Sequence, residues 1–266
     1  MPLDIDWYKI KRMCIEHAEE VLREAEIWRK KGISPYRFSK ILKVRWEKEL
    51  YRRFSKTISK GLSLLGKDTG LLERKGAEIT LVVDLFDGSL NFLFDCKYYS
   101  YNVALFYGLE PIFGLCIDLE TFDVFSALKN QGAFLNEKKL EGPPPFTDRI
   151  VCSNVAIKGF QFLHFGCASL ELCLLAKGAV DLVIGRANTP DIAASMLIAS
   201  EAGATITDWH CKDIKTPLNN METVEYIAGN PESIRRFLGS LRDPSDIMMP
   251  MPSIWSTIAG REIRKL

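Results

Sequence analysis

The hydrophobic pattern of this 266-residue chain changes at residue 79, and that change constrains the fold more than any other feature. From there to about residue 140, apolar segments of strand length alternate with short turns that contain glycine or aspartate. The segments are I-T-L-V-V-D, Y-S-Y-N-V-A-L-F-Y, E-P-I-F-G-L-C-I-D-L, F-D-V-F-S-A-L and G-A-F-L-N-E-K-K-L. Such segments, bounded by turn residues, are typical of β-strands joined by hairpins. The pattern predicts an antiparallel meander in the middle of the chain.

Helices are predicted on both sides of this meander. Before it, apolar residues recur at helical spacing over residues 6–31 and 38–60, and the two stretches stop at Gly32 and Gly61. After it, the run G-P-P-P at residues 142–145 breaks the chain and marks a predicted junction. We therefore expect residues 1–145 to hold the N-terminal helices and the large sheet, residues 146–241 to form an α/β subdomain, and residues 242–266 to be an appended tail. In the second part we expect strands at 149–155, 179–185, A-T-I-T-D and E-Y-I-A-G, with helices at 168–177, 189–203 and from Asn230.

The composition excludes several classes of protein. With 47% apolar residues, 26% charged residues and a net charge of +1, the chain has the balance of a globular protein and gives no charge argument for nucleic acid. The longest apolar stretch, residues 163–185, contains three charged side chains, so we expect no membrane span. Residues 1–75 carry 19 Lys and Arg against 11 Asp and Glu. This basic region is either a solvated helical face or a surface that attracts an anionic substrate or an acidic partner.

Cysteine usage points to the compartment and argues against one kind of metal site. The seven cysteines include no C-x-x-C pair, and the chain has three histidines, so a zinc site of the Cys/His type is not expected. Scattered cysteines and a charged N-terminal segment without an apolar signal region predict a cytoplasmic location.

The segment D-L-F-D-G-S-L-N-F, residues 84–92, carries the clearest chemical signal. It places Asp84 and Asp87 at the end of an apolar strand, where charged side chains are rare without a partner. Two carboxylates this close repel each other unless a cation lies between them, and Mg²⁺ prefers oxygen ligands of this kind. Gly88 and Ser89 leave backbone N–H groups that can hold a phosphate at a helix start. The alternative is an ordinary Asp-Gly turn at the end of a strand.

Another acidic residue, Asp191, lies in T-P-D-I-A-A-S at the predicted start of a helix. An aspartate at this position often only compensates the helix dipole. Asp191 becomes a candidate ligand if the fold brings it to Asp84 and Asp87, and spacing alone does not decide this.

With these residues in place, the chain resembles the inositol monophosphatase family. D-L-F-D-G-S-L-N-F is similar to the family's D-P-[IL]-D-G-[TS]-x-N-F motif, and N-Q-G-A-F-L-N-E is similar to its G-x-G-A-[FY]-L-N-G hairpin. P-D-I-A-A-S-M-L-I-A-S-E-A-G is similar to its W-D-x-A-A-G-x-x-x-x-x-E-A-G motif. The matches keep their order and spacing over about residues 66–240. The family includes archaeal enzymes that also hydrolyse fructose 1,6-bisphosphate.

The resemblance implies an α+β fold, a layered α-β-α-β-α sandwich of the inositol monophosphatase and fructose-1,6-bisphosphatase type. It also implies a homodimer and a phosphomonoesterase with two or more Mg²⁺ ions, whose substrate is a small sugar or polyol phosphate. The Ser89 hydroxyl would help to position the attacking water. The other implied roles are metal ligation by the side chains of Asp84, Asp87 and Asp191 and the carbonyl of Leu85, and phosphate binding at the backbone of Gly88 and Ser89.

The chain departs from the family upstream of these motifs. The family's [GS]-E-E motif, whose first glutamate binds metal and helps to orient the water, is replaced by G-K-D-T-G. Asp68 stands 16 residues before Asp84 and is our candidate for this role, with a carboxylate one methylene shorter; Glu73 is the alternative. A misplacement near 1 Å in a catalytic group can cost about 10²-fold in rate.

Further upstream, the family's acidic segment is replaced by S-P-Y-R-F-S-K-I-L-K. Arg37, Lys40 and Lys43 therefore bring cations to the place where ligands of a third metal would be. A lysine there would repel Mg²⁺, although it could bind a substrate phosphate, and the alternative is a helix that has simply drifted. Arg186 is the candidate substrate contact, because its guanidinium could bind an anionic group, although a surface role fits equally.

Two functions stay open at this stage. The first is a Mg²⁺-dependent phosphatase of a small-molecule phosphate ester, of the inositol monophosphate or fructose 1,6-bisphosphate type, in which Asp68 and Ser89 position the water. The second is a catalytically impaired relative that acts as a binding or assembly protein, with the basic helices or residues 242–266 as its contact surface. In either case we expect neither a nucleic acid nor a membrane as partner.

Overall fold

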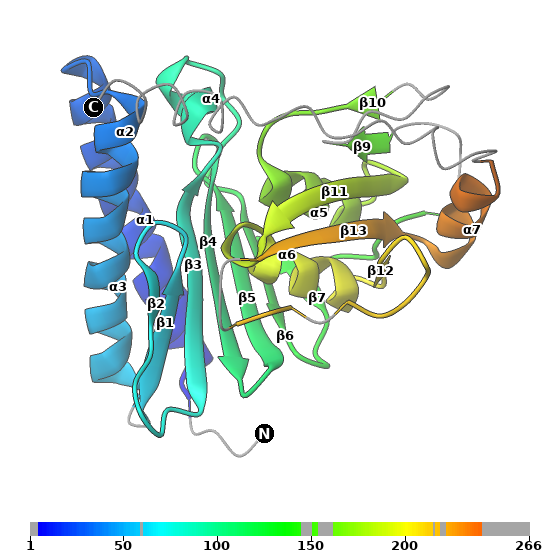
Figure 1. Cartoon of the computed structure of the whole chain (residues 1–266), viewed down its shortest axis with the longest axis horizontal. Helices are drawn as coiled ribbons and strands as arrows, with labels where there is room; N and C mark the ends of the chain where they lie inside the picture. Colours follow the sequence, from blue (N-terminus) through cyan, green and yellow to red (C-terminus); the bar gives the residue numbers. More distant parts are fainter. Residues whose placement is uncertain are drawn as a thin grey trace.

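The computed structural model describes residues 5–58, 61–144, 151–153, 162–214, 216–218 and 222–240. These residues form five layers: an outer pair of helices, a large sheet, a middle pair of helices, a smaller sheet and a last helix (Figure 1). This is the α-β-α-β-α sandwich that the resemblance implied. The predicted tail, residues 242–266, lies outside the described residues, as does residue 145 at the predicted junction.

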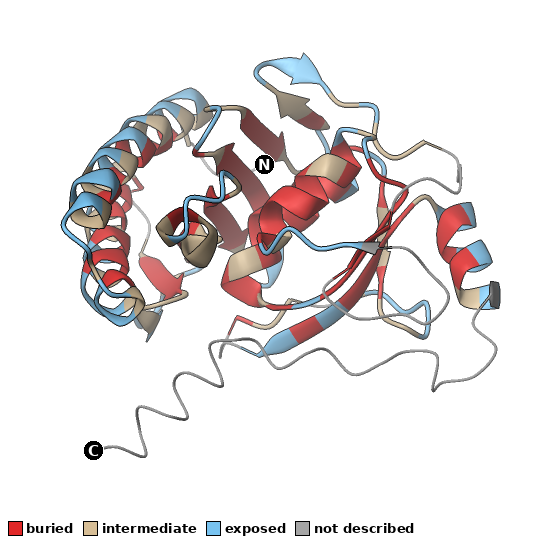
Figure 2. Ribbon diagram, turned by 90° about the horizontal axis from the view of Figure 1, so that it is seen from above, coloured by how far each residue is buried: buried red, intermediate tan, exposed pale blue. Residues whose placement is uncertain are grey.

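The outer layer comes from the basic N-terminal region. Helix α1, Trp7–Lys30, begins at Asp6, whose side chain accepts a hydrogen bond from the N–H of Lys9, and it ends before Gly32. Its buried face is turned to the sheet and its exposed face to solvent (Figure 2). The predicted helix over residues 38–60 is in fact two segments, the π-helix η1 (Phe38–Lys43) and α3 (Val44–Thr57), and a short helix, α2 (Pro35–Arg37), precedes them. Turns of π-helix are rare and are frequently found at functional sites, and this one ends at Lys43.

The large sheet has the order β2-β1-β3-β4-β5-β6-β7-β8. From β3 onward every neighbouring pair is antiparallel, which confirms the predicted meander, whereas β1 runs parallel to β3. Strands β1 and β2 were not predicted; they form an antiparallel hairpin whose turn is residues 67–69. The strands are β1 (Leu62–Gly66), β2 (Gly70–Leu72), β3 (Ile79–Asp87), β4 (Ser100–Tyr107), β5 (Glu110–Asp118), β6 (Val124–Leu128), β7 (Ala133–Leu135) and β8 (Lys138–Lys139). The short helix α4, Ser89–Leu93, follows β3.

The smaller sheet is mixed and has the order β10-β9-β11-β13-β12. Between the two sheets lie α5 and α6, and α6 contacts strands of both sheets. Helix α7, the last one among the described residues, covers the far face of the smaller sheet (Figure 1). None of the helices in the described ranges is long and apolar enough to span a bilayer. The elements are β9 (Val151–Ser153), β10 (Phe162–Leu163), α5 (Ala168–Ala176), β11 (Leu182–Asn188), α6 (Thr189–Glu201), β12 (Thr205–Thr207), β13 (Thr223–Gly229) and α7 (Pro231–Ser240).

The candidate acidic centre

The acidic centre begins at the end of β3. Asp84 is buried and pairs with Asn102 of β4, whereas Asp87 pairs with Ser100, and the register of the two strands shifts in between. An irregularity of this kind re-aims side chains and ends regular pairing. Burial, together with the nearby Asp84 carboxylate, raises the pKa of Asp87 above its ordinary value. The two carboxylates are therefore close enough to repel each other, as the spacing predicted.

The turn between β1 and β2 is held in place by Glu47 of α3. The Glu47 carboxylate accepts hydrogen bonds from the N–H of Asp68, at 3.1 Å, and from the N–H of Thr69, at 2.7 Å. Gly66 lies so close that a Cβ at that position would be 2.3 Å from a Glu47 oxygen. Burial raises the pKa of Glu47 to about 7, against the opposing effect of these hydrogen bonds. Glu47 thus fixes the turn that presents Lys67 and Asp68.

Two lysine side chains pair with three of the carboxylates. The Nζ atom of Lys43 lies 2.9 Å from Oδ2 of Asp68 and 2.8 Å from Oδ1 of Asp84, and the Lys43 side chain is 6% exposed. The Nζ atom of Lys67 lies 2.6 Å from Oδ2 of Asp191. Burial alone would lower the pKa of Lys43, but the two aspartates outweigh it and raise that pKa well above its ordinary value. Burial alone would also lower the pKa of Lys67, but Asp191 and Asp84 outweigh it and raise that pKa, so both lysines are charged at neutral pH.

Asp191 completes the centre from the first turn of α6. Burial raises the pKa of Asp191 to about 7; Lys67 opposes this shift, while Asp84 and Asp87 add to it. Its Oδ1 atom is buried and has no hydrogen-bond partner among the described residues. The fold thus brings Asp191 close to Asp84 and Asp87. The sequence made Asp191 a candidate ligand only if the fold did this.

Asp87 is held on its other side by the start of α5. The Oγ atom of Ser169 donates to Oδ2 of Asp87 at 2.6 Å, the backbone N–H of Ser169 donates to it at 3.2 Å, and the Cys167 thiol donates at 3.2 Å. Ser100 and Asn102 extend this buried network behind Ser169. One oxygen of Asp87 therefore already receives three donors.

The arrangement does not fit a site for Mg²⁺. That ion requires oxygen ligands at about 2.0–2.1 Å in near-octahedral geometry. Here the ammonium groups of Lys43 and Lys67 lie within hydrogen-bond distance of three of the four aspartates. The ammonium groups of Lys43 and Lys67 therefore lie where the resemblance implied metal ions.

The residues predicted to bind phosphate follow directly after Asp87. Gly88 adopts a left-handed conformation with φ of 75°, and a Cβ there would lie 2.7 Å from the carbonyl oxygen of Tyr98, so the position requires glycine. Ser89 is the first residue of α4, and Leu85 is fully buried on β3. Phosphate binding at Gly88 and Ser89 and metal ligation by the Leu85 carbonyl stay predictions.

Two other candidates have partners that bear on their predicted roles. Asp68 is engaged by Lys43 and accepts a hydrogen bond from the Ser39 hydroxyl, so its role in positioning water stays a prediction. Arg186 is exposed on β11 and its Nε atom lies 3.6 Å from a carboxylate oxygen of Glu225 on the neighbouring strand β13. Its contact with substrate also stays a prediction.

Sequence reasoning missed several residues of the centre. In G-K-D-T-G, Lys67 stands at the position of the first glutamate of the family's [GS]-E-E motif, and this replacement was the sign in the sequence that pointed to Lys67. The pairing of Lys67 with Asp191, 124 positions away, was not predicted. Lys43 was named only as a cation that would repel Mg²⁺. Nothing in the sequence pointed to Glu47 or Ser169, because each acts through a contact between elements far apart in the chain.

Comparisons with known proteins agree with this architecture. The sequence model of the inositol monophosphatase family matches residues 46–243. A fructose-1,6-bisphosphatase/inositol-1-monophosphatase from Methanocaldococcus jannaschii is 28% identical over 207 residues, covering 71% of this chain and 82% of that protein. The Nus factor SuhB of Vibrio cholerae is 25% identical over 201 residues, covering 68% and 73%. A solved structure from Pyrococcus horikoshii, described as similar to inositol-1 monophosphatase, superposes with a TM-score of 0.76 at 25% identity and covers 89% of this chain and 98% of that one.

Proposed function

Because the chain belongs to the inositol monophosphatase family, we propose that its acidic centre binds the phosphate of a small sugar or polyol phosphate with lysines in place of Mg²⁺. The family and its relatives support a phosphatase of sugar phosphates as the activity class, and the family is generally metal-dependent. The observation that supports a metal-free centre is the pairing of Lys43 and Lys67 with Asp68, Asp84 and Asp191. Under this proposal the chain is a catalytically impaired member of the family.

The two lysines have different tasks in this proposal. Lys43 is buried and lies between two carboxylates, so it offsets part of the negative charge of the centre. Lys67 is 26% exposed, and an ammonium group has three N–H donors, of which Asp191 takes one. Lys67 therefore supplies the charge-assisted hydrogen bonds to a phosphate, which are stronger than bonds between neutral groups.

Hydrolysis needs more than binding. In a metal-dependent phosphatase the ion lowers the pKa of a bound water and neutralises charge on the leaving oxygen. A lysine offers charge but does not coordinate and acidify a water in this way. Asp68, the candidate for positioning the water, is itself engaged by Lys43. We therefore expect the centre to retain its ester rather than to cleave it.

One observation favours a second candidate, the Mg²⁺-dependent phosphatase acting on inositol monophosphate or fructose 1,6-bisphosphate. The buried Oδ1 atom of Asp191 has no partner among the described residues, and Asp84 and Asp87 are near it. A cation in this place would relieve the repulsion among the three aspartates. The ammonium group of Lys67, on the other oxygen of Asp191, would repel this cation.

Binding and phosphate release, measured with EDTA and with Mg²⁺ on the full chain, distinguish the two candidates. The ligands are inositol monophosphate, fructose 1,6-bisphosphate and an aryl phosphate. The first proposal predicts calorimetric binding in EDTA that is weakened at least tenfold by Lys67→Met and unchanged by Lys48→Met, a control at an exposed lysine of α3. It also predicts no release above that of Asp87→Asn. Mg²⁺-dependent release that is lost in Asp87→Asn would establish the second candidate instead.

Predictions about partners and location accompany this proposal. Since one relative is named a Nus factor, a binding or assembly role is within the range of functions named for relatives of this chain. The homodimer, the cytoplasmic location and the absence of a nucleic acid partner stay predictions.

A further inference from the structure

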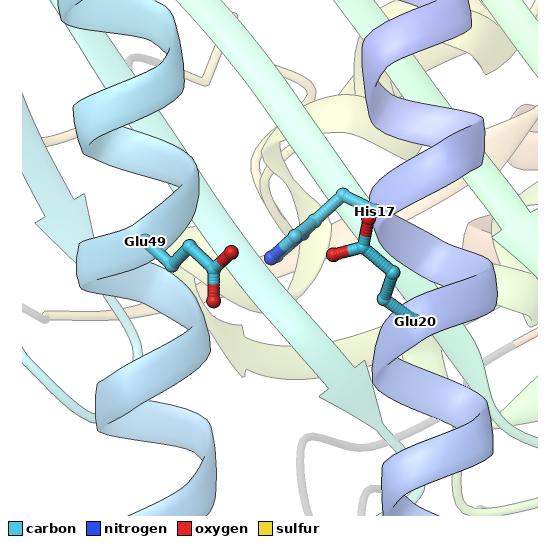
Figure 3. Close-up of side chains that lie close together, drawn as sticks. All are labelled: His17, Glu20 and Glu49. Carbon is cyan, nitrogen blue, oxygen red and sulfur yellow. The ribbon is translucent and has the colours of Figure 1, made fainter.

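A second group of ionisable side chains lies in the outer helical layer, on α1 and α3. His17 and Glu20 are on α1, three residues apart, and Glu49 faces them from α3 (Figure 3). Residues three apart lie on the same face of a helix. One atom from each side chain lies within 4.8 Å of the others. The three residues thus converge on one point between two helices.

His17 is fixed in an orientation that leaves one nitrogen facing this point. Its Nδ1 atom is 2.9 Å from the hydroxyl of Tyr101 on β4, and the two rings are in edge contact. Its Nε2 atom is buried and has no hydrogen-bond partner among the described residues. A buried polar atom without a partner is costly and calls for an explanation. Burial also lowers the pKa of His17 to about 4, so the imidazole is neutral and able to act as a ligand at pH 7.

The nearby Arg53 accounts for the carboxylates but not for the imidazole. Its Nη2 atom lies 2.5 Å from an oxygen of Glu20 and 2.6 Å from an oxygen of Glu49. The Nη1 atom of Arg53 also donates to the second oxygen of Glu20, at 3.3 Å, so Arg53 engages both oxygens of Glu20 and one of Glu49. It leaves Nε2 of His17 without a partner. The Arg53 side chain is 29% exposed, so an ion that binds here has a solvent-facing cation to displace from both carboxylates.

We propose that His17, Glu20 and Glu49 bind a divalent transition-metal ion such as Zn²⁺, which links α1 to α3. One imidazole nitrogen and two carboxylates are a ligand set that Zn²⁺ accepts, with a fourth position for water. The hydroxyl of Tyr101 behind Nδ1 plays the orienting part that such sites usually need. Glu20 is exposed, so the ion has an entry path from solvent. Arg53 competes with the ion for the carboxylates and limits its affinity.

The test is a titration of the metal-free full chain with Co²⁺, followed by its visible absorption, and with Zn²⁺, followed by calorimetry. We expect one ion per chain, binding at least tenfold weaker in His17→Gln and in Glu49→Gln, and at least tenfold tighter in Arg53→Met. Asp191→Asn should bind as the unaltered chain does, because its carboxylate belongs to the acidic centre. Zn²⁺ should also raise the melting temperature of the unaltered chain.

Each contrary result overturns the proposal. Equal binding in the unaltered chain and in Glu49→Gln would place the ion elsewhere, and this variant decides the matter if His17→Gln does not fold. Loss of binding in Asp191→Asn would assign the ion to the acidic centre. Binding seen only in Arg53→Met would show that the natural chain does not use the site. These outcomes are independent of whether the acidic centre binds a phosphate ester.

Discussion

Replacing Lys43 by methionine should destabilise the protein strongly, because it removes a buried cation and leaves its carboxylates in place. Lys43 is 4% exposed overall and its Nζ atom lies within 2.9 Å of both Asp68 and Asp84. Removing one partner from a buried ionic pair costs about 3–5 kcal/mol, since the remaining charge is left uncompensated. For a chain of this size 1 kcal/mol corresponds to roughly 2–4 °C. The expected fall in melting temperature is therefore on the order of 6–20 °C.

The assay is urea unfolding followed by circular dichroism, with Lys48→Met as the matched control. Lys48 is exposed on the same helix, so its replacement should change the free energy of unfolding by no more than about 0.5 kcal/mol. Millimolar Mg²⁺ should restore part of the stability lost in Lys43→Met and have little effect on the unaltered chain, because a ligand stabilises only the state that binds it. A loss below about 1 kcal/mol in Lys43→Met, in a folded protein, would refute the reasoning.

Three further predictions concern the residues around the centre. Ser169→Ala should reduce the free energy of unfolding by about 1.5–3 kcal/mol in urea unfolding, because it removes a hydrogen bond to the partly buried Asp87 carboxylate, and a loss near zero would contradict this role. Gly88→Ala should cost about 1–3 kcal/mol or more in thermal unfolding, since φ is 75° and the new Cβ would meet the Tyr98 carbonyl; unaltered stability would show that the turn relaxes freely. Burial raises the pKa of Glu47 from 4.5 to about 7, so on raising the pH the unfolded state loses the carboxyl proton of Glu47 before the folded state does. The stability that Glu47 contributes is therefore complete below pH 4.5 and falls as the pH rises to about 7. Glu47→Gln should flatten this part of the stability profile, and an identical slope in the variant would contradict the assignment.

The large sheet was predictable because its strands carry a local signal. Each strand from β3 to β6 is an apolar run that ends at a turn residue, so each can be recognised from about ten consecutive residues. Strands β1 and β2 are five and three residues long and follow a basic helix, so no such run set them apart. The π-helical segment before Lys43 was also missed, because the spacing of its apolar residues is close to that of an α-helix.

The acidic side of the centre was predictable, whereas its neutralisation was not. The pattern D-x-x-D at a strand end and the resemblance that it supports pointed to Asp84, Asp87 and Asp191 together. Which cation lies next to these three aspartates depends on side chains that belong to other helices and strands. Lys43 comes from the end of the π-helix η1, and Lys67 reaches Asp191 across 124 positions. Contacts of this range follow from packing, and a single sequence does not encode them in any local pattern.

The most direct test of the account measures whether a divalent ion enters the acidic centre. Mn²⁺, which stands in for Mg²⁺ and has a paramagnetic signal that diminishes on binding, is titrated into the unaltered chain, Asp87→Asn and Lys43→Met. If Lys43 and Lys67 serve as the cations of this centre, the unaltered chain and Asp87→Asn bind Mn²⁺ equally, and Lys43→Met gains a site. Tight binding in the unaltered chain that disappears in Asp87→Asn would contradict the account and return the metal-dependent phosphatase to first place.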